Sequence, residues 1–297
     1  MMSSILQTAP EVAPRGASPL LLLDADYLSY MIGGISQGME KDNSIEGQQL
    51  WCADEDKDIW VWIDPLDLVK WRVDNEIEKI KDKFNSDSME VWLTPHEGNF
   101  RNEVAVSRPY KGKRTSARPY HYQAIRDHMV EAHQAEVAVG CEADDMVCIR
   151  QMHSHVSGVP SVIVGIDKDL KCMYGHHYNP RKDEFIWVTA LDAALNFYGQ
   201  MITGDTVDNI PGCQGRGVKY WEKLLDKRLK YDGTVDIDWV HQDVYEAYEE
   251  KGHDSDYFVE QGTLLHMRRH VDEVWTVDYD WYEGFNPRME STVCLSQ

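Results

Sequence analysis

Short apolar runs recur along the first two-thirds of the chain, and each run ends in acidic or polar residues. The runs are LLLLDAD (20–26), IWVWID (59–64), MEVWLTP (89–95) and SVIVGIDKD (161–169). Apolar runs of this length are typical of strands that are buried on both faces of a parallel sheet. We therefore expect these four segments to be strands of one sheet.

Segments with a helical pattern lie between and after the predicted strands, at 66–84, 120–135, 142–155 and 189–202. Strands that alternate with helices predict an α/β fold, in which helices flank a central, mostly parallel sheet. Ligands of such sheets gather beyond the carboxyl ends of the strands. Three acidic residues fall there, namely Asp24, Asp167 and Asp169.

The pattern changes near residue 200, where we place a domain boundary. Beyond residue 203, glycine-rich turns and amphipathic helical segments replace the apolar runs. The division gives a leader (1–19), a core (20–200) and a C-terminal helical region (201–297). The Ala, Pro and Ser content of the leader predicts flexibility, and the leader lacks the pattern of a secretory signal. The segment 231–260 predicts helices, and 274–285 predicts a packing strand.

Composition limits the class of protein. A chain of 297 residues with 42% hydrophobic and 27% charged residues is long enough to bury a sizeable core. No apolar run approaches the length that spans a membrane. Six cysteines without a CxxC pair indicate reduced thiols. We expect a cytoplasmic monomer without membrane attachment.

The charge is unevenly spread. A formal net charge of −21 argues at first against nucleic acid, whose binding proteins usually carry basic faces. However, residues 101–118 contain six Lys and Arg against one Glu, and residues 214–230 contain six against two acidic residues. Each basic segment alone is equally well explained as a solvated surface. Together they leave nucleic-acid binding open.

Eight carboxylates form four short clusters at predicted ends of elements. They belong to Asp24, Glu142, Asp144, Asp145, Asp167, Asp169, Asp205 and Asp208. Each cluster alone is compatible with a helix cap or a turn. The three carboxylates at 142–145 are more than one helix cap needs. Asp167 and Asp169 are two residues apart, and residues two apart on a strand share a face. Four independent caps would not explain all eight carboxylates.

If these carboxylates converge, they need counter-charge. Oxygen ligands without a Cys/His cluster favour Mg²⁺ or Mn²⁺ over zinc. Two such ions could bind a phosphate, generate hydroxide and stabilise the leaving oxygen. The glycine-rich stretch GDTVDNIPGCQGRGVK (204–219) adds amides at a helix N-terminus, which favour phosphate. A plain turn that packs two helices is the alternative interpretation of this stretch.

The order of these motifs resembles the 5′-nuclease superfamily, which contains flap endonucleases, the 5′-nuclease domain of bacterial DNA polymerase I and phage 5′→3′ exonucleases. The segment 99–114 resembles that family's FR…YKxxR, GCEADD its GxEADD helix start, IDKD its DxD strand end, and 204–219 its GDxxDNIPGxxGxGxK motif. The match runs from about residue 20 to 228, and the phage branch is the most similar. It implies a PIN-like 5′-nuclease core with a basic arch near 99–130 and a C-terminal helix–hairpin–helix region.

The resemblance also implies site residues. The positions that match ligands of the first metal ion are Asp24, Glu142, Asp144 and Asp145. The positions that match ligands of the second are Asp167, Asp169, Asp205 and Asp208. Lys111 and Arg114 match catalytic basic residues that steer the scissile phosphate. The implied DNA-contacting residues are Arg101, Tyr110, Lys113, Gly212, Gly215, Arg216, Gly217 and Lys219.

The implied activity is a structure-specific 5′→3′ exonuclease or flap endonuclease that uses two Mg²⁺ ions, with Mn²⁺ as a substitute and K⁺ at the hairpin. The implied substrates are DNA with 5′ ends or 5′ flaps, and RNA–DNA hybrids. The phage branch implies a role in DNA replication, primer removal or recombination in the host-cell cytoplasm.

One position departs from the family pattern. Related proteins place a metal-binding Asp after the strand that MEVWL matches, whereas this chain has Thr94-Pro95-His96-Glu97. Glu97 could substitute, or a water molecule could fill the gap. Two alternatives stay open: a DNA-binding relative with weakened catalysis, and a haloacid-dehalogenase-type phosphatase. LLLLDAD resembles the DxD strand of such phosphatases, with Asp24 as nucleophile and Asp26 as acid.

Overall fold

The computed structural model describes residues 18–39, 45–114, 117–229 and 235–278, so almost all of the predicted leader lies outside the described residues. The strands are β1 (Leu20–Asp24), β2 (Gln37–Gly38), β3 (Gln49–Asp54), β4 (Ile59–Ile63), β5 (Met89–Leu93), β6 (Glu136–Val137), β7 (Ser161–Val164), β8 (Gly175–Asn179) and β9 (Glu184–Val188). The helices are α1 (Asp26–Ile35), α2 (Leu66–Phe84), α3 (Arg101–Val104), α4 (Tyr122–His133), α5 (Ala143–Ser157), the 3₁₀ turn η1 (Asp169–Cys172), α6 (Ala190–Thr203), α7 (Val218–Arg228), α8 (Ile237–Glu249) and α9 (Ser255–Leu265).

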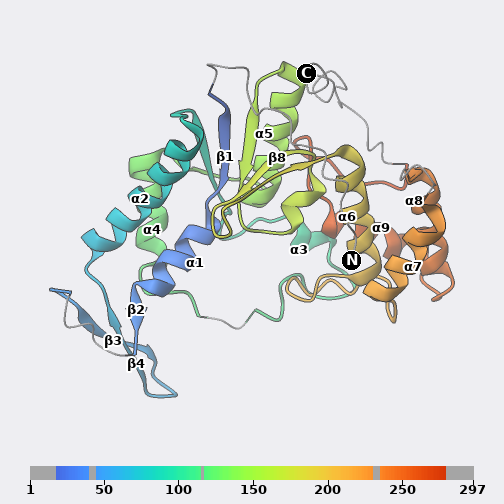
Figure 1. Ribbon diagram of the computed structural model, residues 1–297. Coiled ribbons are helices and arrows are strands. Elements are labelled where there is room, and N and C mark those ends of the chain that lie inside the picture. The colour runs from blue at the N-terminus through green and yellow to red at the C-terminus, as the bar shows by residue number, and fades with distance from the viewer. Residues whose placement is uncertain (1–17, 40–44, 115–116, 230–234, 279–297) are drawn as a thin grey trace.

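A six-stranded sheet forms the centre of the molecule (Figure 1), with the strand order β6-β5-β1-β7-β8-β9. All neighbouring strands are parallel except β9, which pairs with β8 in the antiparallel direction. This arrangement confirms the predicted fold class of a mostly parallel sheet flanked by helices. The carboxyl ends of β1 and β7 are neighbours, because Leu23 pairs with Val164.

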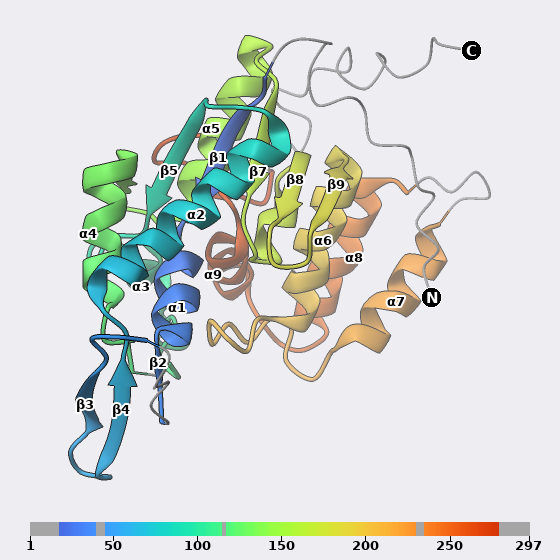
Figure 2. The ribbon, with the colours of Figure 1, turned by 60° about the vertical axis from the view of Figure 1, so that its left-hand side comes forward.

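Both faces of the sheet are buried, which explains why the strands carry continuous apolar runs. Leu21 and Leu23 pack with residues of α2 and α4 on one face, and Leu22 packs with residues of α5 and α6 on the other. Alternate side chains of a strand point to opposite faces, so neither face of β1 is open to polar residues. The two helical layers lie on either side of the sheet in the turned view (Figure 2).

One predicted strand lies outside the central sheet, so that part of the prediction is wrong. The IWVWI segment is β4 of a separate antiparallel sheet with the order β2-β4-β3, which projects from the body of the molecule (Figure 2). Val61 and Ile63 are buried, whereas Trp60 is 48% exposed. This one-sided burial is typical of an antiparallel strand with one face in water. Because tryptophan is apolar, the more exposed positions of this strand looked like buried ones, and the sequence did not show the alternation.

The C-terminal helices share the core of the sheet. One cluster of buried side chains joins Leu22 of β1 to Val240 of α8 and Phe258 of α9. Residue 200 lies inside α6, so the domain division near this residue stays a prediction. Residues 274–278 form no strand although Trp275 is fully buried, and 279–285 lie outside the described residues. No helix of the described segments has the length and apolarity needed to cross a membrane.

Candidate metal centre

The carboxyl ends of β1 and β7 bring acidic side chains from two parts of the chain together. Asp24 is the last residue of β1, and Asp167 follows β7 by three residues. Burial raises the pKa of the Asp24 carboxyl well above its usual range, and the charges of Asp26, Asp167 and Glu142 raise it further. These charges act on Asp24 because they lie close to it. Asp26 was not among the residues expected to bind metal.

The N-terminus of α5 adds a second group of carboxylates. Glu142 is the N-cap residue of this helix, and Asp144 and Asp145 lie in its first turn. Burial, followed by the charges of Asp145 and Glu142, raises the pKa of Asp144 well above its usual range. Burial also acts to raise the pKa of Glu142, but the positive charges of Lys111 and Arg101 outweigh it and lower that pKa. At Asp144, by contrast, burial and the neighbouring carboxylates outweigh the positive charges of Arg101 and Lys111.

The basic segment 110–114 lies directly on these acids. The Tyr110 hydroxyl is 2.7 Å from Glu142 Oε2 and 2.9 Å from Asp208 Oδ2. Lys111 forms an ion pair with Glu142, and its Nζ is 3.8 Å from Asp208 Oδ2. Arg114 Nη2 is 2.7 Å from Asp208 Oδ1. The basic segment therefore joins Glu142 at the start of α5 to Asp208 in the turn after α6.

The loop after β7 meets the turn after α6 through a lysine. Lys168 Nζ is 2.6 Å from Asp205 Oδ2 and 3.7 Å from Asp169 Oδ1. Burial and the neighbouring charge of Asp167 raise the pKa of Asp169 to about 7. Lys168 was not expected at the site, although its position between the two aspartates of IDKD was a visible signal.

The turn between α6 and α7 is held in shape by its backbone. Asp205 and Ile210 exchange backbone hydrogen bonds of 2.8 and 2.7 Å, and Lys111 N donates to Asp208 O at 2.9 Å. Gly212 has a φ of +62°, and a Cβ there would lie 2.4 Å from the nitrogen of Gly204. Only glycine fits that combination of left-handed backbone and close approach.

The residues of this turn that we expected to contact DNA differ in their exposure to solvent. Gly212 is buried, and its amide donates to Gln261 Oε1 at 3.1 Å, so this amide is not free to bind phosphate. Arg216 stacks on the Tyr220 ring and pairs with Glu250. The remaining expected residues of the turn are exposed, namely Gly215, Gly217 and Lys219.

Arg101 requires a correction, because the structure places it in the core rather than on a DNA-facing surface. Its side chain is 1% exposed. Its guanidinium nitrogens Nη1 and Nη2 donate to Asp145 at 2.5 and 2.9 Å, and it also donates to the carbonyls of Leu264 and His266. Both oxygens of Asp145 are thereby occupied, and they also accept from the amides of Glu142 and Arg268. The predicted ligand role of Asp145 has no support in this arrangement.

Thr94 stands where the family pattern has an aspartate, and its polar groups are all engaged. Its hydroxyl accepts from Ala143 N at 2.9 Å, and its amide donates to Asp26 Oδ1 at 3.1 Å. Arg126 contacts both Asp26 and the Thr94 carbonyl, at 3.0 and 2.5 Å. Glu97 is exposed beyond the end of β5. Thr94 therefore joins the end of β5 to the start of α5 without supplying a carboxylate.

The donor set of this site suits hard divalent cations, because it consists of carboxylate oxygens. Burial, and after it the neighbouring carboxylates, raise the pKa values of Asp24 and Asp144, so both carboxyls favour the protonated form unless a cation binds. Among the described residues, no three of these carboxylates have oxygens within 4.8 Å of one another. Lys111 and Lys168 lie between carboxylates of different clusters. An ion would therefore have to draw the carboxylates closer together.

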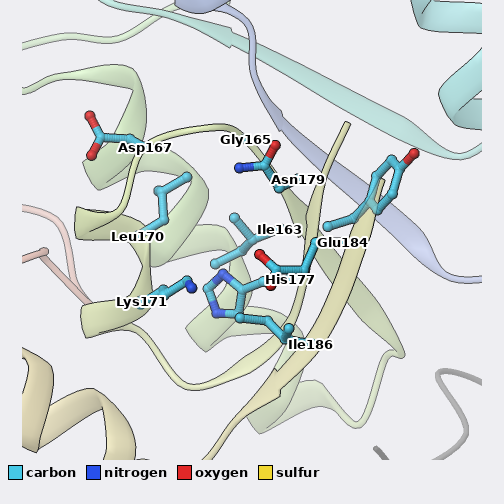
Figure 3. Close-up of a pocket in the computed structure, with 10 residues that line it drawn as sticks. Ile163, Gly165, Asp167, Leu170, Lys171, His177, Asn179, Glu184 and Ile186 are labelled. Atoms are coloured by element: carbon cyan, nitrogen blue, oxygen red, sulfur yellow. The ribbon is translucent and has the colours of Figure 1, made fainter. Parts of the chain in front are cut away.

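A small, partly open pocket lies next to this site, between β7, β8, β9 and η1 (Figure 3). Asp167 is the only one of the eight carboxylates that lines it, and in the close-up its carboxylate points away from His177 and Glu184. The pocket therefore borders the acidic cluster at Asp167 and is otherwise lined by other residues.

No protein-family model matches the chain. Among curated proteins, the DNA polymerase I of Rhizobium leguminosarum is 32% identical over 99 residues, which cover 30% of this chain and 10% of the polymerase. Among solved structures, T5 5′-exonuclease with bound zinc ions is similar with a TM-score of 0.51 and 14% identity, over 83% of this chain and 89% of the exonuclease. A structure of the T5 protein co-crystallised with metal ions gives the same values.

At this identity the structural likeness shows the fold. It confirms at the level of the fold the resemblance to 5′-nucleases that the motifs indicated, and it does not favour the phosphatase alternative. The functional roles of the individual site residues stay predictions.

Proposed function

We propose that this chain is a metal-dependent 5′-nuclease that hydrolyses DNA phosphodiesters at a 5′ end or a 5′ flap. The observation that carries the proposal has two parts. Asp167 and Glu142 lie close enough to Asp24 for their charges to raise its pKa, and the basic segment 110–114 contacts both Glu142 and Asp208. The 5′-nuclease fold and the local similarity to a DNA polymerase I support the same activity. Resemblance to the phage branch supports a role in DNA replication, primer removal or recombination in a host cytoplasm.

Two groups of carboxylates would hold two Mg²⁺ ions, with Mn²⁺ as a substitute. Asp24, Glu142 and Asp144 form the first group. The second group consists of Asp167, Asp169, Asp205 and Asp208. When bound, the ions would supply Lewis-acid activation of the phosphate and of the attacking water.

Lys111 and Arg114 would stabilise the negative charge of the scissile phosphate. Both are paired with carboxylates of the cluster, and Arg114 is about half exposed. A phosphate that enters the site offers these cations a second anionic partner. The Tyr110 hydroxyl contacts Glu142 and Asp208, and the Lys111 amide donates to the Asp208 carbonyl, so the segment that carries the two cations is held beside these acids. Because they are pre-positioned, little reorganisation is needed when the charge develops.

Arg101 and Asp145 would act as positioning residues. Their ion pair fixes the start of α5, from which Glu142 and Asp144 project. Both are buried, so neither needs to contact DNA or metal to affect the activity.

The turn between α6 and α7 would grip the DNA backbone through Gly215, Gly217 and Lys219, which are exposed, and through a bound K⁺ ion. Lys113 is also exposed and would contact a phosphate. Such contacts are independent of base sequence and weaken as salt is added. RNA–DNA hybrids present a similar phosphate backbone, so we include them among the substrates.

A DNA-binding protein with weak catalysis is the second candidate function, and Thr94 is the observation that favours it. Its hydroxyl is committed to Ala143 N, so the first metal group has one carboxylate fewer than the family pattern. Such a protein would bind flap DNA in Mg²⁺ without cleaving it.

Digestion of 5′-flap and blunt duplexes in Mg²⁺ tests the proposal. We expect Asp167→Asn and Glu142→Gln to lose at least ~100-fold in rate, because each removes a ligand of an essential ion. Asp67→Asn, an exposed carboxylate on α2, is the matched control and should cleave at the wild-type rate. Equal rates in all four proteins would refute the site. Binding without cleavage by the wild-type protein would favour the second candidate.

A further inference from the structure

Three side chains outside the acidic cluster meet between α2 and α4. Asp74 lies on α2, His128 lies on α4, and His133 is the last residue of α4. His128 Nε2 and His133 Nε2 are 2.6 and 2.7 Å from the same oxygen of Asp74, Oδ1. Among the described residues, this is the only trio of His, Cys, Asp or Glu side chains whose ligand atoms all lie within 4.8 Å.

The two imidazoles are largely buried, unlike the side chains of typical surface histidines. Each histidine side chain is 12% exposed, and the two rings are nearly perpendicular, with centroids 5.7 Å apart. The Asp74 side chain is 43% exposed, so its carboxylate borders solvent. Two largely buried nitrogen donors and one solvent-bordering oxygen donor thus lie together where α2 and α4 pack.

We propose that Asp74, His128 and His133 bind a transition-metal ion of the Zn²⁺ class, separate from the Mg²⁺ sites. Imidazole nitrogens prefer such ions, whereas carboxylates alone prefer Mg²⁺. Zinc holds its nitrogen ligands at about 2.0–2.1 Å in a tetrahedron, so neighbouring ligand atoms stand roughly 3.3 Å apart. The nitrogen–oxygen distances must therefore widen by only ~0.6 Å. A water molecule completes the tetrahedron on the exposed side of Asp74.

The ion would link α2 to the helix that supports the acidic cluster. Arg126 stands two residues before His128 on α4, which places the two side chains on nearly opposite sides of the helix. Arg126 contacts Asp26 and Thr94, whereas His128 contacts Asp74 of α2. Fixing α4 to α2 would thus stabilise the position of Arg126 behind the candidate Mg²⁺ site.

Calorimetric titration of the full chain with Zn²⁺ in excess Mg²⁺ tests the proposal, because Mg²⁺ competes for the acidic cluster and leaves the imidazole site free. We expect one tight Zn²⁺ site in the wild-type protein. His128→Gln and Asp74→Asn should bind at this site at least ~10-fold more weakly. His153→Gln removes an exposed histidine on α5 and should bind as the wild type does.

Two further measurements separate this site from the acidic cluster. Asp167→Asn should keep the tight Zn²⁺ site, and Co²⁺ bound to the wild-type protein should show visible absorption that His133→Gln lacks. Circular dichroism verifies that each variant is folded. A wild-type protein without a tight site, a tight site that survives in His128→Gln and Asp74→Asn, or its loss in Asp167→Asn would each overturn the proposal.

Discussion

The guanidinium of Arg101 binds both carboxylate oxygens of Asp145, at 2.5 and 2.9 Å, across 44 positions of the sequence. Both side chains are almost completely buried, at 1% and 0% exposed. Burial acts to raise the pKa of Asp145, but the Arg101 charge and hydrogen bonds outweigh it and lower that pKa. The pair is therefore ionised inside the core, and each charge depends on the other.

Arg101→Lys should destabilise the fold by about 3 kcal/mol or more, because a lysine cannot reproduce the two-point contact and leaves the Asp145 carboxylate partly unpaired. Chemical denaturation measures this loss. Lys113→Ala, which removes an exposed cation from the Lys- and Arg-rich residues 101–118, should leave the unfolding free energy within about 0.5 kcal/mol of the wild type. A stable Arg101→Lys protein with reduced DNA affinity would restore the DNA-binding role that the sequence predicted.

Asp169 should make the metal-free protein less stable as pH rises. Its pKa in the folded protein is about 7, above the ordinary value of 3.8, so the folded state favours the protonated carboxyl. The associated stability is present below about pH 4 and is lost as the pH rises through about 7.

In EDTA near pH 4, Asp169→Asn should therefore melt at the same temperature as the wild type. Above pH 7, the variant should melt at least ~2 °C higher than the wild type, which is the shift that a stability difference of roughly 1 kcal/mol produces. Thermal melts across this range measure the difference. At pH 8, millimolar Mg²⁺ should stabilise the wild-type protein, so that the wild type then melts at a higher temperature than Asp169→Asn. A difference that does not vary with pH would contradict the assignment of the raised pKa to Asp169.

Gly212→Ala should destabilise the turn between α6 and α7 by at least about 2 kcal/mol, because a left-handed alanine is strained and its Cβ would meet the backbone of Gly204. Gly217→Ala is the matched control: its φ of −133° suits any residue, and a Cβ there meets nothing within 4 Å. Melting curves of the two variants give the comparison. Similar melting temperatures would mean that the turn can rearrange.

Local patterns along the sequence determined which segments form the central strands and where the acidic residues lie. The apolar runs at 20–23, 89–93 and 161–164 form adjacent strands because they are buried on both faces. The acidic clusters were recognisable because parallel strands and helix starts direct their ends to one edge of a sheet. The position of Asp24 at the carboxyl end of β1 follows from such a local rule.

Tertiary structure alone decided how charges pair. Arg101 looked like a DNA-binding residue, yet its partner is Asp145, and Lys168 and Asp26 join the acidic site through neighbours distant in sequence. IWVWI pairs with β2 and β3 in a separate sheet, where Trp60 faces solvent, and its apolar composition does not reveal this. Asp74 and the two histidines of α4 meet only when α2 and α4 pack. A sequence fixes the type and spacing of charged groups, but ion pairing depends on distance and burial in the folded chain.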